Sequence, residues 1–103
     1  MKKTAKAKIT WTPPEKGGRR LIDTGITYAI PARFEEEAHK YPKEAWSLVI
    51  ELVEPPNESL ETLAMVWLLV GDKPEAPNHL LHPGSRFELF DGNVIVAAGV
   101  VLE

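Results

Sequence analysis

Two groups of side chains could carry chemistry, and neither has a spacing that supports it. His79 and His82 form an H-x-x-H pair among prolines, and the acidic run at 35–37 lies beside a proline break. A zinc site needs three or four ligands, and the spacing provides no third one. Paired catalytic carboxylates must be held at a set separation by rigid elements, which a polar run does not supply. We therefore interpret Glu35, Glu36, Glu37 and both histidines as ordinary loop residues.

The sequence also lacks the common catalytic and cofactor-binding motifs. It contains no G-x-x-x-x-G-K-[ST] or G-x-G-x-x-G phosphate loop. None of Ser47, Ser59 and Ser85 lies in a G-x-S-x-G elbow. The absence of cysteine excludes disulfides, thiolate zinc ligands and a cysteine nucleophile, and it fits a reducing compartment. We expect no catalytic site, no metal and no cofactor.

Basic residues are concentrated near the N-terminus. Residues 1–20 contain seven Lys or Arg against Glu15 alone, whereas the rest of the chain has five basic and 14 acidic residues. Such a segregated charge can guide a polyanion to one side of a protein. The plainer interpretation is a flexible basic N-terminus with lysines facing water, because charge runs commonly form solvated faces.

No targeting or membrane segment is evident in the sequence. The charged start MKKTAKAKITW is similar to the front of a secretory signal, but Lys6, Lys8 and Thr10 interrupt the apolar run that a signal needs. The longest apolar stretch, LAMVWLLV, is strand-sized and far shorter than the roughly 20 residues of a membrane helix. We expect a soluble, cytoplasmic protein without membrane association.

The 103 residues suit one domain, 1–103, in which we expect residues 1–4 to be flexible. Apolar residues alternate with period 2, which predicts strands. Residues 4–12 are the clearest strand. Residues 26–34 form another, with Pro31 marking an edge, a bulge or a corner. The predicted buried faces of these two strands carry Ala5, Ala7, Ile9 and Trp11, and Ile26, Tyr28, Ile30, Ala32 and Phe34.

Two central segments allow two interpretations each. Residues 45–53 are rich in β-branched and aromatic types, which favours a strand, but they also allow a short helix. Residues 60–70 are apolar on both faces in their second half, which fits a strand packed against another element or, alternatively, a buried helix. The polar segment 35–43 fits either one helical turn or a loop, and residues 71–85 predict a long loop. The aromatic residues of the strands are expected in the core rather than on a base-stacking surface. They are Trp11, Tyr28, Phe34, Trp46 and Trp67.

The stretch 86–101 predicts the closing hairpin. Asp-Gly-Asn at 91–93 is a strong turn signal, and Gly99 inside a strand indicates a bulge or a close backbone approach. With about six short strands separated by turns, the chain predicts an all-β barrel or sandwich. The inward face of the hairpin is expected to carry Phe87, Leu89, Val94, Val96, Ala98, Val100 and Leu102.

Three segments of the chain carry short motifs of a known domain, in the same order as in that domain. They are EKGGRR at 15–20, TYAIPARF at 27–34 and PGSRFELFDGNVIVAAGVV at 83–101. Together they resemble the C-terminal β-barrel domain of bacterial elongation factor Tu. That domain has a Gly-Gly-Arg loop, a Tyr-Arg-Pro-Gln-Phe strand, and a closing hairpin with an Arg-Phe pair, an acidic-glycine turn and a Gly-Val-Val end. The resemblance covers the chain from about Lys6 to Leu102. It implies a single six-stranded antiparallel Greek-key β-barrel.

The resemblance also implies a binding surface. In elongation factor Tu this barrel helps to grip the T-stem backbone of aminoacyl-tRNA and contacts the nucleotide exchange factor. The present chain departs from the family pattern, because it carries neither the GTPase domain nor the middle barrel, and because its arginine, Arg33, follows the proline. We expect a stand-alone domain rather than an elongation factor. The residues that match the family motifs are Gly17, Gly18 and Arg19, Arg86 and Phe87, and Asp91 and Gly92.

A stand-alone module that binds a protein partner is the function we favour, since it requires no chemistry. The alternative is binding of an RNA, tRNA-like backbone through the basic strand and the Gly-Gly-Arg loop. An enzyme with an unrecognised site is a third possibility, and a homo-oligomer could form through strand edges. The candidate binding residues are Lys6, Lys8, Lys16, Gly17, Gly18, Arg19, Arg20, Arg86, Asp91 and Gly92.

Overall fold

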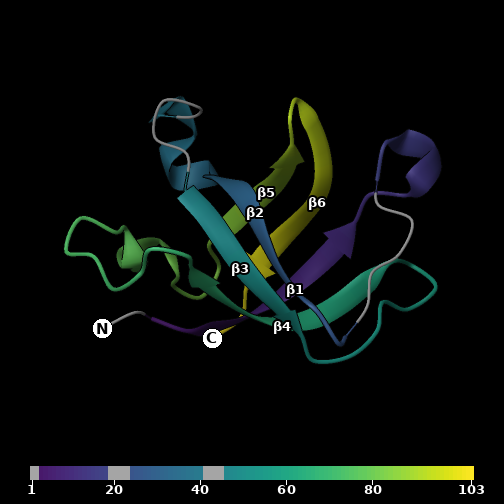
Figure 1. Ribbon diagram of the computed structural model, residues 1–103, viewed down its shortest axis with the longest axis horizontal. Coiled ribbons are helices and arrows are strands. Elements are labelled where there is room, and N and C mark those ends of the chain that lie inside the picture. The colour runs from purple at the N-terminus through teal and green to yellow at the C-terminus, as the bar shows by residue number, and fades with distance from the viewer. Residues whose placement is uncertain (1–2, 19–23, 41–45) are drawn as a thin grey trace.

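The computed structural model describes residues 3–18, 24–40 and 46–103, and the predicted binding residues Arg19 and Arg20 lie outside these ranges. Six strands and three short 3-10 helices make up the described part of the chain (Figure 1). The strands are β1 (Ala5–Trp11), β2 (Thr27–Phe34), β3 (Trp46–Leu52), β4 (Glu61–Leu68), β5 (Arg86–Asp91) and β6 (Val94–Val101). The 3-10 helices are η1 (Pro14–Lys16), η2 (Glu35–Lys40) and η3 (Asn78–Leu80). No helix in these ranges is long and apolar enough to span a membrane.

The strands form one closed antiparallel barrel in the order β1-β4-β3-β2-β5-β6. Strands β2, β3 and β4 follow one another as neighbours, and β5 returns across the barrel to lie beside β2. A run of three consecutive neighbours flanked by a strand that returns to the first of them is a Greek key. The predicted all-β, six-stranded antiparallel barrel is therefore confirmed.

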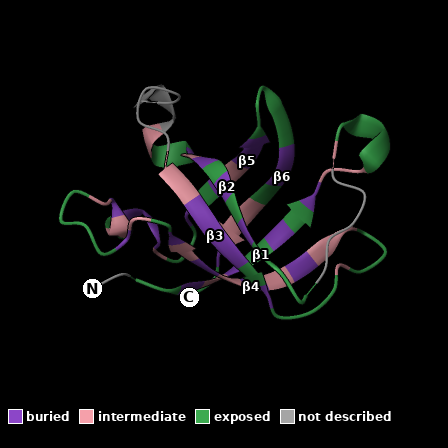
Figure 2. Cartoon of the chain, viewed as in Figure 1, coloured by how far each residue is buried: buried purple, intermediate pink, exposed green. Residues whose placement is uncertain are grey.

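The period-2 pattern determines most of the barrel wall. In β1, the predicted inward residues are buried, and Lys8 and Thr10 between them are exposed, as the alternating colours of Figure 2 show. The segments predicted with a helical alternative are strands, because β4 alternates between buried and half-buried residues along its whole length. The loop 71–85 adds Leu80 and Leu81 to the core, where both are fully buried.

The prediction of which β6 side chains face the core was wrong beyond Val96. The register pairs Leu89 with Ala97 and Phe90 with Ile95, so Val96 is an extra residue in a β-bulge. The extra residue reverses which side chains face the core. Val96 and Ala97 are both buried, and from there the odd-numbered residues face inward. Three residues predicted to face the core are therefore exposed or half-buried: Ala98, Val100 and Leu102. Val94, also predicted to face the core, lies before the bulge next to the hairpin turn and is 43% exposed.

Three predictions at the other strands have mixed outcomes. Ile26 lies just before β2 and is 54% exposed, so it is not part of the predicted inward face. Trp67 alternates with the buried Val66 and Leu68 and is half-buried on the outer face, so its prediction as a core residue was wrong. Pro31 pairs with Ser47 of β3, whereas β2 meets β5 only at 32–34. Pro31 thus occupies an edge-like position, as predicted.

The close approach predicted at Gly99 is made by a side chain. A Cβ atom placed on Gly99 would lie 2.4 Å from Cζ of Phe87, far inside van der Waals contact. The Phe87 ring is itself buried and packs against Phe34, with the ring centroids 5.6 Å apart. Gly99 is therefore required because the core aromatic of the neighbouring strand occupies the space of a side chain.

We predict that Gly99→Ala destabilises the protein by about 1–3 kcal/mol, because the enclosed Phe87 ring cannot move away without straining the core. Chemical denaturation would measure the change in the free energy of unfolding. Gly25→Ala is the matched control, since a Cβ there meets nothing within 4 Å. Equal stability of the two variants would contradict the packing explanation.

Candidate functional site

A shallow groove crosses the outside of the barrel over β6 and its two neighbours. It consists of two adjoining hollows of about 410 and 270 Å³ that share Arg86, Ala98 and Gly99. The larger hollow extends over β5 and β2 to Arg33, Glu35 and Glu88, and the smaller one extends over β1 to Lys8 and Thr10. We call these two hollows together the β6 groove.

The groove exists because β6 is lined with small residues between two strands that carry long ones. Ala98 pairs with Thr10 of β1 on one side and with Glu88 of β5 on the other. Val100 pairs in the same way with Lys8 and Arg86. Side chains on one face of a sheet stand roughly perpendicular to it, so the alanine and valine form a floor and the longer residues form walls.

The β2–β5 wall is held by an ion pair. Arg33 and Glu88 lie opposite each other in the register, and Arg33 Nε donates to Glu88 Oε1 at 3.1 Å. A second guanidinium nitrogen of Arg33 donates to the same oxygen. The guanidinium also lies 5.0 Å from the centroid of the Phe90 ring, a cation–π distance. This wall is thus ordered and close to neutral.

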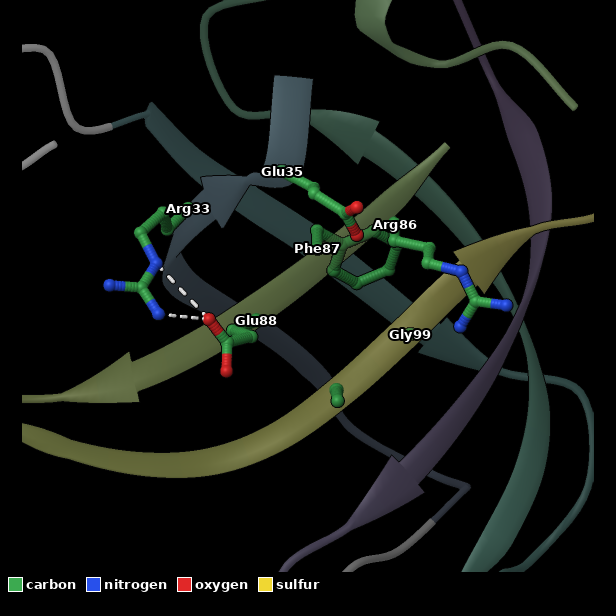
Figure 3. A pocket seen from close by; sticks show the side chains of 7 residues that line it. Arg33, Glu35, Arg86, Phe87, Glu88 and Gly99 are labelled. Carbon is green, nitrogen blue, oxygen red and sulfur yellow. Dashed lines mark hydrogen bonds and ion pairs between the residues drawn. The ribbon is translucent and has the colours of Figure 1, made fainter. Parts of the chain in front are cut away.

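The smaller hollow leaves one cation available. Lys8 Nζ lies 3.1 Å from a carboxylate oxygen of Glu61 on β4. Arg86 is exposed, and it forms no ion pair with any residue in the described ranges. Its side chain extends away from the Arg33–Glu88 pair (Figure 3). A guanidinium without an intramolecular partner at a groove wall is suited to receiving an anionic group from outside.

The structure separates the predicted binding residues into two groups. Lys8 and Arg86 both line the smaller hollow of the groove. Lys6 lies outside the groove on the same strand as Lys8, and its Nζ is 4.0 Å from Oε1 of Glu103. Gly17 of the turn after η1 approaches the closing hairpin, since a Cβ on it would lie 2.8 Å from Val94 Cγ1. This second group therefore contains Lys16, Gly17, Gly18, Asp91 and Gly92.

The two groups lie at opposite ends of the hairpin. Arg86 begins β5 and Asp91 ends it, so at about 3.4 Å per residue they are about 17 Å apart. Gly92 has a φ of 63°, a left-handed value that the predicted turn requires. A ligand on the groove would contact Arg86 without reaching this turn.

Sequence reasoning missed several residues of the groove. Arg33 and Glu88 are 55 residues apart, and nothing in either local sequence indicates that they pair. Ala98 was assigned to the core because the bulge was not foreseen. The position of Thr10 on the outer surface could be predicted, because Thr10 lies with Lys6 and Lys8 on the polar face of the first strand.

The two loop groups that carried no predicted function pair with each other. His82 Nε2 hydrogen-bonds to Glu36 Oε1, and His79 Nε2 lies 3.7 Å from Glu37 Oε2. The pairs join the loop 71–85 to η2, next to the β2 end of the groove. Within the described ranges, no three His, Asp or Glu side chains are placed to hold a metal. The hydrogen bond that His82 donates to Glu36, aided by the Pro83 carbonyl, raises the pKa of His82 above its usual value.

Comparison with known proteins gives no assignment of family or function. No protein-family model matches the chain, and no curated protein matches it significantly.

We predict that the His82–Glu36 pair makes stability depend on pH. Because the pKa of His82 is raised in the folded protein, its stabilisation is fully present below the unfolded-state value of about 6.5 and is lost as pH rises through the folded-state value. His82→Gln should therefore lower the urea midpoint at pH 6, and the difference from wild type should narrow by pH 8.5.

His79→Gln is the control for this measurement, because its contact with Glu37 is longer and carries no hydrogen bond. It should change the midpoint less at pH 6. A midpoint difference for His82→Gln that stays constant between the two pH values would rule out the proposed titration.

Proposed function

We propose that this chain is a cytoplasmic binding module, built on a barrel like the C-terminal domain of elongation factor Tu, and that it binds a protein partner in the β6 groove. The observation that carries the proposal is the continuous groove with Ala98 and Gly99 as its floor and Arg86 at its wall. A long, open and shallow depression suits an extended polypeptide segment better than an enclosed small molecule.

The chemistry of the groove favours binding over catalysis. Its lining contains no serine, histidine or cysteine that could act as a nucleophile. Its two carboxylates, Glu35 and Glu88, differ in role, since Glu88 is engaged by Arg33. Arginine is enriched at the centre of protein interfaces, where its planar group can both stack and donate.

A protein partner is favoured over the RNA alternative by the charges around the groove. Phosphate contacts need available cations, and they dominate affinity for nucleic acids. Lys6 and Lys8 both lie next to carboxylates, those of Glu103 and Glu61. Glu35 and Glu88 line the larger hollow and would repel a phosphate chain placed along it.

Site-specific photocrosslinking would test the proposal. A benzoylphenylalanine at Ala98, in the groove, should capture one discrete protein from native lysate, whereas the same residue at Ala29 should not. Ala29 is a matched control because both are exposed alanines on strands of the barrel. The captured protein, once purified, should bind the unmodified chain.

Other outcomes would contradict the proposal. An Ala98 adduct that disappears on ribonuclease treatment would support RNA binding instead. An adduct with a second copy of the chain would indicate self-association. Equal adducts from both positions, or none, would show that the groove has no selective partner.

A further inference from the structure

The smaller hollow of the β6 groove combines two cations and a hydroxyl around a low floor. Lys8 and Arg86 pair with the same residue, Val100, from the strands on its two sides. Neighbouring strands lie about 4.8 Å apart, so the two Cα atoms are about 10 Å from each other. Both side chains stand on the outer face and are longer than that of Val100 between them, which leaves room above the valine for one small anionic group.

Thr10 is the third residue of this hollow that can donate a hydrogen bond. Thr10 lies two residues after Lys8 on the same face of β1, and it lines the same hollow. Ala98, Gly99 and the half-buried Val100 form its floor, and none of them carries a charge. An anion above this floor could therefore accept hydrogen bonds from Arg86, Lys8 and Thr10.

We propose that this hollow binds the side-chain carboxylate of an acidic residue in an extended segment of the protein partner. The inference rests on the proposed function and adds the chemistry of recognition. Arg86 is the main contact, because it has no intramolecular partner in the described ranges and its fork matches a carboxylate in two-point geometry. Lys8 is shared between the incoming carboxylate and Glu61.

The surroundings favour a single carboxylate over a run of phosphates. Glu61 lies beside Lys8, and Glu35 and Glu88 line the adjoining larger hollow. These groups tolerate one negative charge next to Arg86 but repel further charges spaced along a chain. The floor of Ala98 and Gly99 instead accommodates small apolar side chains on either side of the acidic residue.

A titration of the ¹⁵N-labelled protein with acetyl-Ala-Ala-Glu-Ala-Ala-amide, followed by NMR at low salt, tests this inference. The peptide should shift the backbone amides of Lys8, Thr10 and residues 98–100, and the same peptide with Gln in place of Glu should not. Arg86→Gln should weaken binding about tenfold, since a charge-assisted bidentate contact is lost. The spectrum of this variant also reports whether it is folded.

Lys6→Gln is the matched control, because Lys6 is on the outer face of the same strand but does not line the groove. It should bind the Glu peptide as wild type does. Equal shifts with the Glu and Gln peptides, or no shifts at all, would overturn the inference. Stronger shifts of the same amides with a uridine decanucleotide or with inorganic phosphate would overturn it as well.

The two proposals fail in different ways. If Ala98 still captures its protein partner in the Arg86→Gln background and the Glu peptide does not bind, only the carboxylate subsite is refuted. If Ala98 captures no specific protein in the unsubstituted background, the proposed function itself is refuted.

Discussion

The contact between the Phe87 ring and Gly99 determines both the packing of the core at this point and which residues of β6 face outward. The ring fills the core at the seam between β5 and β6, where it also packs against Phe34. It fits only because β6 offers a backbone without a side chain at that point. Since inward and outward residues alternate, this requirement places the small Ala98 and Val100 on the outer face. The core packing and the floor of the groove therefore have one origin.

The bulge at Val96 makes this arrangement possible. Without the extra residue, the alternation along β6 would direct Ala98 and Val100 to the core and Gly99 to the outside. One inserted residue reverses the phase, so Gly99 faces the ring of Phe87. Bulges commonly redirect side chains next to functional surfaces. Here the redirected strand separates two walls, and a ligand in the groove can contact both the Arg86 guanidinium and the Arg33–Glu88 ion pair.

The predictable part of the fold is the part with one polar and one apolar face. In β1, lysines alternate with apolar residues, so the phase could be determined from the residues alone. In β6 both faces are apolar or small, and period 2 does not distinguish them. The shape of the barrel and the two-residue turn at Gly92 were foreseeable. The position of the bulge was not, because neither face of β6 carries a polar residue that marks it.

The candidate site was predictable to a smaller extent. Lys8 and Arg86 were chosen for charge and for a family resemblance, and the register across β6 brings them together. The Arg33–Glu88 and His82–Glu36 pairs join residues far apart in the chain, so no local pattern could reveal them. Long-range pairing of this kind follows from topology, which the residue types constrain only loosely.

The central claim, that the ring of Phe87 and the missing side chain of Gly99 are one coupled unit, is tested most directly by a double-mutant cycle. The free energies of unfolding of Gly99→Ala, Phe87→Leu and the double variant would be compared with that of the wild type. The smaller leucine leaves room for the added methyl group, so the double variant should be more stable than additivity predicts, by about 1 kcal/mol. Additive effects of the two substitutions would contradict the account.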